Sequence, residues 1–306
     1  MSIELKLKKY TAEDIARITG GRLENYGADE KLEHSFISTD SRDVSTGVIF
    51  CAIKGENVDG NDYIKNAAEL GCDLCICQYV PEDAKKEKIC AIIVEDTIKA
   101  IGDIASDYRN ASKAKFIGVT GSVGKTTTKE FTHLVVNAKY NAIKTQGNLN
   151  NEIGLPQMLF QIDNSIEAAV IEMGMNHFGE ISRLVNATKP TIALITNIGV
   201  SHIENLGSRE GILKAKLEIT EGLKEGAPLI LNGDDDMLST VKSDKHKIYF
   251  YGINNGDFKA VNVLEENNKT SFSINYFGNS IDVVIPTIGI HNVYNAVAAF
   301  AVGYFL

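Results

Sequence analysis

Residues 121–128, GSVGKTTT, place two glycines, a lysine and three threonines shortly after an apolar run, FIGV. Glycines let backbone N–H groups converge on one point, where they can donate to phosphate oxygens, and lysine adds a positive charge. The residue five positions before Gly124 is Val119, so the loop departs from the strict phosphate-loop consensus, which has glycine there. The alternative is a glycine turn that opens a threonine-rich helix. The combination of residues favours binding of ATP or a close relative.

Seven residues are expected to contact this nucleotide. Lys125 can reach the β- and γ-phosphates, and the Thr126 hydroxyl is a suitable ligand for Mg²⁺. The other residues of the loop supply backbone donors. The expected set is Gly121, Ser122, Val123, Gly124, Lys125, Thr126 and Thr127.

Glu172 ends a second apolar run, AAVIE. A strand that ends in an acid is the usual companion of a phosphate loop, because it brings a carboxylate to the metal ion. On its own such a glutamate is more often structural. Beside a phosphate loop, the metal-binding interpretation becomes the better one.

His202 follows a third apolar run, TIALITNIG, and Lys216 lies 14 residues later on a predicted helix. A lone histidine is usually a satisfied polar group and a lone lysine is usually solvated. These two matter because the carboxyl ends of parallel strands converge on one crevice. A lysine whose pKa is lowered by burial can react with CO₂ to form a carbamate, which is an anionic metal ligand. Lys214 faces another side of the predicted helix and is the poorer candidate.

The elements that must position these residues alternate between strands and helices, which is the pattern of an α/β fold. Nearly continuous apolar runs, such as AAVIEM and TIALITNIG, favour parallel strands that are covered on both faces. The phosphate loop should lie between the strand FIGV and the helix KEFTHLVVNA. In that helix the predicted apolar stripe consists of Phe131, Leu134, Val135 and Ala138.

A polar stretch at residues 107–115, DYRNASKAK, predicts a boundary between two domains. We expect a small N-terminal α/β domain over residues 1–112. A central ATPase domain of the phosphate-loop type, with a mostly parallel sheet, should follow over residues 113–306. The sequence ends in GIHNVYNAVAAFAVGYFL, an apolar helix without a capping signal. We therefore expect a further domain to follow it.

The composition excludes several classes of protein. The formal net charge of −9 argues against a general nucleic-acid binder. No apolar run reaches the roughly 18 to 20 residues of a membrane span, and the N-terminus lacks the apolar core of a signal peptide. We expect a cytoplasmic protein without membrane insertion. The five cysteines lie in apolar runs of the first third, where a buried core position is favoured over a metal site.

Six stretches, in chain order, resemble the Mur ligases, a family of ATP-dependent amide ligases in peptidoglycan precursor synthesis. They are TGSVGKTTTKE, GNLNNEIGLP, EMGMNHFGEI, TNIGVSHIENLGS, KAKLEI and GIHNVYNAVAAFAVG. The resemblance spans nearly the whole chain. It is greatest to the member that joins D-alanyl-D-alanine to UDP-N-acetylmuramoyl-tripeptide. The member that adds the third amino acid would show a serine-rich stretch in place of MGMNHFGEI.

The resemblance implies a role for each candidate near the nucleotide. Lys125 and the glycine loop would hold the ATP phosphates. Thr126 and Glu172 would bind one Mg²⁺ ion, and His202 with carbamylated Lys216 would serve a second. The residues expected to be catalytic are Lys125, Glu172, His202, Lys216 and Asn151.

The resemblance also implies three contacts with substrates. Asn151 would lie near the acceptor carboxylate, and Asn292 and Asn295 would contact the adenosine. Ser41 and Arg42, within STDSRDVSTG, would bind the diphosphate of the UDP substrate. From composition alone, the DSR turn is more often an ordinary surface turn.

The implied reaction transfers the γ-phosphoryl group of ATP to the carboxylate of the tripeptide, and the amine of D-alanyl-D-alanine then attacks the acyl phosphate. Two alternatives remain. One is a phosphate-loop ATPase or kinase, which would leave the UDP-like segment unexplained. The other is a fragment that binds ATP and the UDP substrate but does not ligate them, since the expected third domain would close over ATP and complete the amino-substrate site.

Overall fold

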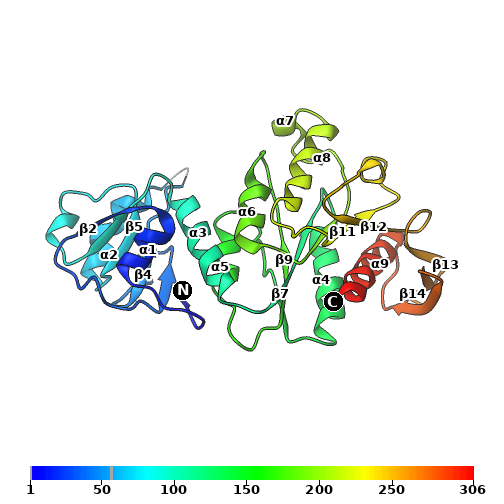
Figure 1. The fold of residues 1–306 in the computed structure, drawn as a ribbon, viewed down its shortest axis with the longest axis horizontal. Coiled ribbons are helices and arrows are strands. Elements are labelled where there is room, and N and C mark those ends of the chain that lie inside the picture. The colour runs from blue at the N-terminus through cyan, green and yellow to red at the C-terminus, as the bar shows by residue number, and fades with distance from the viewer. Residues whose placement is uncertain (1, 56–57) are drawn as a thin grey trace. The chain divides into compact units, whose positions relative to one another are not determined.

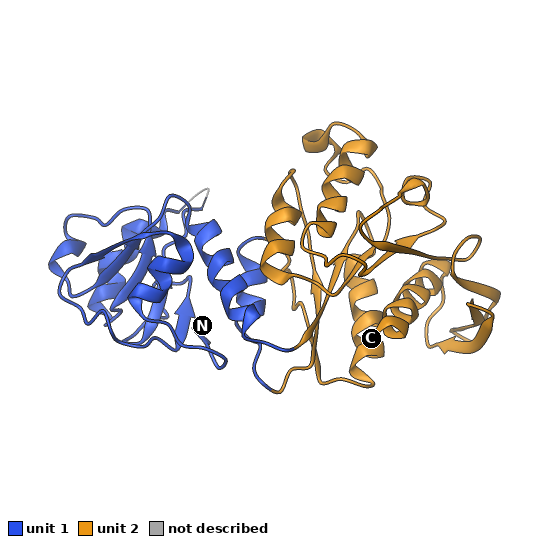
Figure 2. Cartoon of the chain, viewed as in Figure 1, with its two compact units in different colours: residues 1–113, 152–164 blue, residues 114–151, 165–306 orange. Residues whose placement is uncertain are grey.

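The computed structural model describes residues 2–55 and 58–306, which divide into two compact units (Figure 2). The first unit comprises the chain up to Lys113 together with Glu152–Asn164, and the rest of the chain forms the second. The first break lies one residue beyond the boundary expected between residues 112 and 113. The assignment of substrate and ATP binding to separate domains stays a prediction.

The segment Glu152–Asn164 groups with the first unit, although residues 113–306 were expected to form one domain. Its Phe160 ring packs edge-on against the Tyr108 ring, with 5.7 Å between ring centroids. The Tyr108 hydroxyl donates to the Ile162 carbonyl at 2.9 Å. These contacts join segments more than 40 residues apart, which no local sequence pattern reveals.

The first unit is built on a six-stranded sheet whose four central strands are parallel and whose edge strands are antiparallel (Figure 1). In spatial order these are β1 (Ile3–Glu4), β3 (Phe36–Ser38), β4 (Val48–Cys51), β5 (Leu74–Cys77), β6 (Cys90–Ile93) and β2 (Arg22–Asn25). The helices are α1 (Ala12–Thr19), α2 (Ile64–Glu69), α3 (Thr97–Asn110) and α5 (Gly154–Leu159), with the short 3₁₀ helices η1 (Gly60–Tyr63) and η2 (Ala84–Lys86).

All five cysteines lie in the buried interior of this unit. Cys75 and Cys77 belong to β5, where every side chain is buried, and their sulfur atoms are 3.9 Å apart. Burial raises the pKa of the Cys90 thiol to about 11. These are the properties of small apolar core residues rather than of reactive thiols.

The second unit contains a nine-stranded sheet, parallel from β8 through β13 and antiparallel from β13 to β15, so the predicted mostly parallel sheet is confirmed (Figure 1). In spatial order the strands are β15 (Asn279–Ile285), β14 (Lys269–Tyr276), β13 (Phe258–Glu266), β12 (Lys247–Gly252), β11 (Pro228–Asn232), β10 (Ile192–Ile195), β7 (Lys115–Thr120), β9 (Ala168–Glu172) and β8 (Ala142–Lys144). The antiparallel strands β13 to β15 were not anticipated from the sequence.

The helices of the second unit lie between these strands in the chain, except α9, which follows the last strand. They are α4 (Lys125–Asn137), α6 (Glu180–Thr188), α7 (Ile203–Leu206), α8 (Arg209–Leu217) and α9 (Ile290–Phe305), with the 3₁₀ helices η3 (Glu218–Thr220) and η4 (Leu238–Thr240). Helix α9 packs against α4 and against strands β10 to β13. Among residues 2–55 and 58–306, no helix combines the length and the apolar character that a membrane crossing requires.

The predicted apolar stripe of α4 is only partly right: Phe131 is partly buried and packs against the core, but Val135 and Ala138 are exposed. Leu134 is 69% exposed, and the face that is buried carries Thr128, Lys129, Thr132 and Val136. The reason is that α4 packs against α9 on one side and against β8 and β9 on another, so its threonine-bearing face is covered. Lys129 belongs to this covered face, so its side chain is buried close to the end of β9.

Candidate active site

The phosphate loop has a backbone that only glycine can adopt at its first turn. Gly121 has a φ of +152°, and a Cβ atom at this position would lie 1.9 Å from Thr196 Oγ1. Gly124 has a φ of +79° and precedes the first residue of α4. The two glycines therefore shape the loop between β7 and α4 in the conformation that the sequence pattern requires.

The segment that follows β10 holds this loop in place. Thr196 Oγ1 donates to the Val123 carbonyl at 2.7 Å, and Asn197 Oδ1 accepts from the Val123 N–H at 3.0 Å. The Ser122 hydroxyl oxygen accepts from the Gly199 N–H at 2.9 Å. The neighbouring strands β7 and β10 end at the same edge of the sheet, so the segment after β10 can hydrogen-bond to the phosphate loop after β7.

Lys125 opens α4 at the mouth of the loop. Its Nζ donates to the Gly121 carbonyl at 2.9 Å and lies 3.3 Å from the Ser122 carbonyl. Partial burial lowers the pKa of Lys125, and the nearby Glu172 carboxylate counteracts that effect. The ammonium group is thus kept beside the loop backbone, and its contact with a phosphate stays a prediction.

Glu172 lies at the end of β9 and is only 2% exposed. Its Oε1 accepts from Thr126 Oγ1 at 3.2 Å and from Asn150 Nδ2 at 3.0 Å. The Glu172 N–H donates to Thr145 Oγ1 at 2.9 Å. The carboxylate and the threonine hydroxyl that the resemblance assigns to one metal ion are therefore neighbours, and their binding of a metal ion stays a prediction.

A cavity of about 230 Å³ lies beside the phosphate loop. Its lining residues are Gly121, Ser122, Lys125, Asn150, Asn151, Gly174, Met175, Asn176, Glu180, His202 and Lys216. Four residues singled out from the sequence therefore line one cavity. They are Lys125, Asn151, His202 and Lys216.

His202 and Lys216 reach this cavity in different ways. His202 has a φ of +61°, an uncommon conformation for a residue other than glycine, and precedes α7. Lys216 is 3% exposed on α8, and burial, together with the positive charge of Lys125, lowers its pKa to about 7. Lys214 is exposed, with its ammonium group 5.8 Å from the centre of the Phe178 ring.

In the first unit, Ser41 and Arg42 lie in the turn after β3. The guanidinium group of Arg42 donates to both carboxylate oxygens of Asp40, at 2.9 and 2.7 Å, and holds the pKa of Asp40 well below its usual range. The resemblance around Ser41 and Arg42 extends over residues 38–64, and Glu56 and Asn57 of this segment lie outside the described residues.

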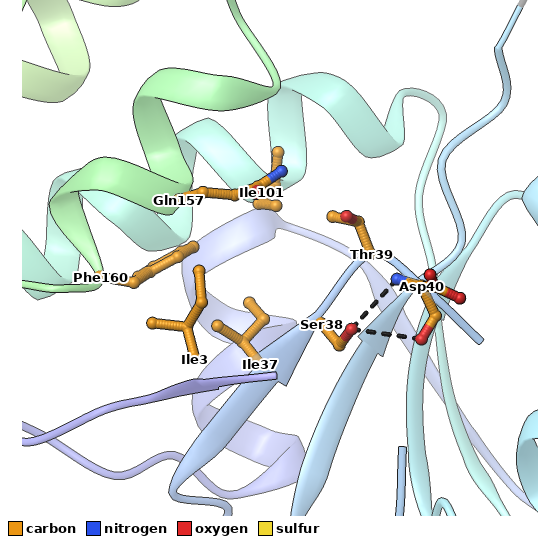
Figure 3. Close-up of a pocket in the computed structure, with 8 residues that line it drawn as sticks. All are labelled: Ile3, Ile37, Ser38, Thr39, Asp40, Ile101, Gln157 and Phe160. Carbon is orange, nitrogen blue, oxygen red and sulfur yellow. Dashed lines mark hydrogen bonds between the residues drawn. The ribbon is translucent and has the colours of Figure 1, made fainter. Parts of the chain in front are cut away.

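A small pocket of about 60 Å³ adjoins this turn (Figure 3). Its lining residues are Ile3, Ile37, Ser38, Thr39, Asp40, Ile101, Gln157 and Phe160. Isoleucine and phenylalanine side chains form one side, and a turn closed by the Ser38 hydroxyl and the Asp40 backbone forms the other (Figure 3). The pocket thus has an apolar wall beside a polar turn.

Two family profiles match this chain. The Mur ligase middle domain matches residues 119–303, which include the phosphate loop and the whole cavity, and the Mur ligase family catalytic domain matches residues 33–109. The chain belongs to the Mur ligase family. The fold expected from the resemblance is confirmed by solved structures of other members of the family.

Individual members of the Mur ligase family are similar to this chain over most of its length. A UDP-N-acetylmuramoyl-tripeptide–D-alanyl-D-alanine ligase of Bacillus subtilis is 40% identical over 96% of the chain. A crystal structure of MurF from Acinetobacter baumannii is 32% identical, covers 97% of the chain and has a TM-score of 0.88. MurF ligase of Thermotoga maritima, solved in complex with ADP, is 28% identical over 87% of the chain, with a TM-score of 0.80. The chain spans 64%, 65% and 62% of the lengths of these three proteins.

The asparagines assigned from the Mur ligase resemblance lie in two places. Asn151 lines the cavity. Asn292 and Asn295 are buried on α9, where Asn295 Oδ1 accepts from Thr128 Oγ1 at 2.8 Å and lies 3.9 Å from the Cβ position of Gly124. Asn295 therefore adjoins the phosphate loop, and Asn292 lies beside it on α9, with its Oδ1 accepting from Asn295 Nδ2 at 3.4 Å. Their contact with adenosine stays a prediction.

Three residues near the cavity were missed. Asn150 binds Glu172, Glu180 lines the cavity, and Lys129 lies behind the carboxylate. Asn150 and Glu180 fall within the stretches NLNNEIG and EMGMNHFGEI, so a search for every polar residue of those stretches would have found them. Lys129 was hidden because a lysine on a helix is normally solvated.

Proposed function

We propose that this chain is the nucleotide- and substrate-binding part of a ligase that joins D-alanyl-D-alanine to UDP-N-acetylmuramoyl-tripeptide in peptidoglycan precursor synthesis. The observation that carries the proposal is the cavity in which a phosphate-loop lysine, His202 and a buried lysine meet, with the Thr126–Glu172 pair beside it. The name of the 40% identical Bacillus subtilis relative supports the choice of substrates. ATP and nucleotide-linked precursors are cytoplasmic metabolites, so we propose a cytoplasmic location.

ATP is the proposed phosphoryl donor, and the ADP complex of the Thermotoga maritima relative supports it. The loop residues Gly121 to Thr127 would surround the phosphates, with the Lys125 ammonium group against the transferred one. Asn292 and Asn295 would contact the adenosine, since Asn295 adjoins the loop at Gly124.

The residues present fit a Mg²⁺ ion. Oxygen ligands next to each other around octahedral Mg²⁺ lie about 3 Å apart, because each is about 2.0–2.1 Å from the ion. Thr126 Oγ1 and Glu172 Oε1 are 3.2 Å apart, so both can serve one ion without rearrangement of the backbone. When bound, Mg²⁺ neutralises charge that develops on the phosphoryl oxygens.

His202 and Lys216 would hold a second Mg²⁺ ion, with Lys216 as its carbamate. The amine must be neutral to attack CO₂, and a pKa of about 7 keeps much of Lys216 neutral at physiological pH. Reaction of the neutral amine with CO₂ would release one proton and leave a negative charge near Lys125. The new anion would then balance Lys125 and offer oxygen to the metal ion.

Ser41 and Arg42 are proposed to bind the diphosphate of the UDP substrate, and the pocket of Figure 3 would receive part of the attached nucleoside. Arg42 is exposed, and the guanidinium N–H groups that do not donate to Asp40 are accessible to a phosphate. Its contact with Asp40 already directs the guanidinium group along the turn.

The chemistry requires activation of a carboxylate, because oxide is a poor leaving group. Asn151 would position the tripeptide carboxylate in line with the γ-phosphate, and Lys125 would offset the repulsion between the two anions. Transfer of the phosphoryl group breaks the bond to ADP and forms an acyl phosphate. The amine of D-alanyl-D-alanine then forms the amide and releases phosphate.

The proposal is tested by incubation of the chain with ATP, Mg²⁺ and UDP-N-acetylmuramoyl-tripeptide, with and without D-alanyl-D-alanine, and analysis of products by mass spectrometry. Binding of ATP and of the UDP substrate is the expected result, and formation of UDP-N-acetylmuramoyl-pentapeptide, with one ADP per amide, would show that this chain also ligates. ADP release that is independent of the UDP substrate would favour a simple ATPase. Binding of both nucleotides without any pentapeptide would support the binding sites and refute ligation by this chain.

A further inference from the structure

Lys129 is a buried cation that the proposed reaction does not use. It lies one turn after Lys125 on α4, and its side chain is only 3% exposed. Lysine is rarely buried unless an anion or several acceptors compensate its charge. Its surroundings therefore indicate what it does.

The ammonium group of Lys129 connects the two segments that hold Glu172. It donates to the Thr145 carbonyl at 2.8 Å and lies 3.5 Å from Glu172 Oε2. Thr145 in turn accepts the Glu172 N–H through its hydroxyl oxygen. Lys129 thus fixes the backbone that orients Glu172 and faces its side chain at the same time. Its remaining anionic neighbour, Glu130 Oε1 at 3.4 Å, belongs to a side chain that is 42% exposed.

The two carboxylate oxygens of Glu172 have different surroundings. Oε1 accepts from Thr126 and Asn150, and Asn150 lines the cavity. Oε2 is buried, and among the described residues none donates a hydrogen bond to it. The charge of Lys129 is what faces Oε2, since hydrogen-bond donors occupy only the other oxygen.

We propose that Lys129 is a positioning residue for the carboxylate that binds the metal ion: its charge retains Oε2 in the interior, so that Glu172 presents Oε1 alone to Mg²⁺. The proposal rests on the proposed nucleotide site. Groups that orient a metal ligand from behind typically change metal affinity 10–100-fold when they are removed. Without Lys129, the carboxylate loses its partner on one side and turns toward the donors on the other.

The test compares Lys129→Met with the unchanged chain in binding of a non-hydrolysable ATP analogue by calorimetry, at graded Mg²⁺ concentrations and in EDTA. We expect the Mg²⁺ concentration for half-maximal binding to rise about 10–100-fold in Lys129→Met. Binding in EDTA should stay within about twofold, because the phosphate loop is untouched. Lys129→Arg keeps the charge and should show a smaller shift.

Lys144→Met is the matched control. Like Lys129, Lys144 forms an ion pair with Glu130. Its side chain is 32% exposed, however, and its anionic partner is Glu130 rather than Glu172. Its loss should leave the Mg²⁺ dependence unchanged. A Lys129→Met protein with unaltered melting temperature and unaltered Mg²⁺ dependence would overturn the inference, and so would an equal shift in Lys144→Met.

Glu172→Gln provides the second measurement, which also covers the case in which Lys129→Met does not fold. In the Glu172→Gln background, addition of Lys129→Met should fold and cause no further shift in Mg²⁺ dependence, because the carboxylate that Lys129 orients is absent. A further shift of tenfold or more in that background would overturn the inference. Absence of Mg²⁺-dependent binding in the unchanged chain would instead refute the proposed nucleotide site, and the inference with it.

Discussion

Substitution of Gly121 by alanine tests whether the phosphate loop needs the geometry seen here. The added methyl group would lie 1.9 Å from Thr196 Oγ1, about 1.5 Å short of ordinary contact. Thr196 cannot easily withdraw, since its hydroxyl donates to Val123 and its N–H donates to the Thr120 carbonyl at 2.9 Å. The loop must therefore move instead.

The free-energy cost of the Gly121→Ala substitution has two parts. A φ of +152° in a residue other than glycine costs about 1–3 kcal/mol, and overpacking adds about 1–3 kcal/mol. We expect Gly121→Ala to lower the free energy of unfolding of the second unit by about 2–6 kcal/mol. A displacement of about 1 Å in a group that positions a substrate costs about 100-fold in activity. Nucleotide affinity should fall by a comparable factor.

The assay is calorimetric binding of the ATP analogue, combined with thermal unfolding. Gly226→Ala is the control, because Gly226 lies in the same unit with a φ of +76° and has no atom within 4 Å of its Cβ position. It should lose about 1 kcal/mol of stability and retain nucleotide affinity. Gly121→Ala with the affinity of the unchanged chain would show that the close approach of Thr196 and the loop is not required for phosphate binding.

Three further predictions concern the two lysines of the cavity. Lys125→Ala should abolish measurable binding of the ATP analogue. The melting temperature should stay within a few degrees, since the Lys125 side chain contacts loop carbonyls rather than the core. Retained affinity would contradict the phosphate-loop assignment. Carbon-13 NMR with labelled bicarbonate should detect a carbamate in the unchanged chain above pH 7, because only the neutral amine reacts. The signal should be absent from Lys216→Ala. The same signal in both proteins would exclude Lys216 as the carbamylated residue. In buffer free of CO₂, Lys216→Met should be more stable than the unchanged chain at pH 7. Since the pKa of Lys216 is about 7 in the folded state and near 10.4 when unfolded, this difference should shrink as the pH rises toward 10. A difference that does not change with pH would contradict the lowered pKa.

The phosphate loop could be predicted from sequence because its determinants are local. Gly121, Gly124, Lys125 and Thr126 lie within six residues, and a strand, a turn and a helix follow one another without the help of distant segments. The same reasoning placed Glu172 at the end of a strand, since strand ends in a parallel sheet gather at one edge. Periodicity and spacing were sufficient for these residues.

Only the tertiary structure decided which sides of these elements are covered. Helical periodicity favoured Leu134 for the core, but α9 and the strands β8 and β9 cover another face, so Leu134 is exposed and Lys129 is buried. The neighbours Asn150 and Asn151 have the same chemistry in sequence, and the fold determines which one contacts Glu172. Segments that meet across many residues, such as Tyr108 and Ile162, leave no local signal. Sequence therefore determined the chemistry of the loop, and packing between distant segments determined which other charges surround it.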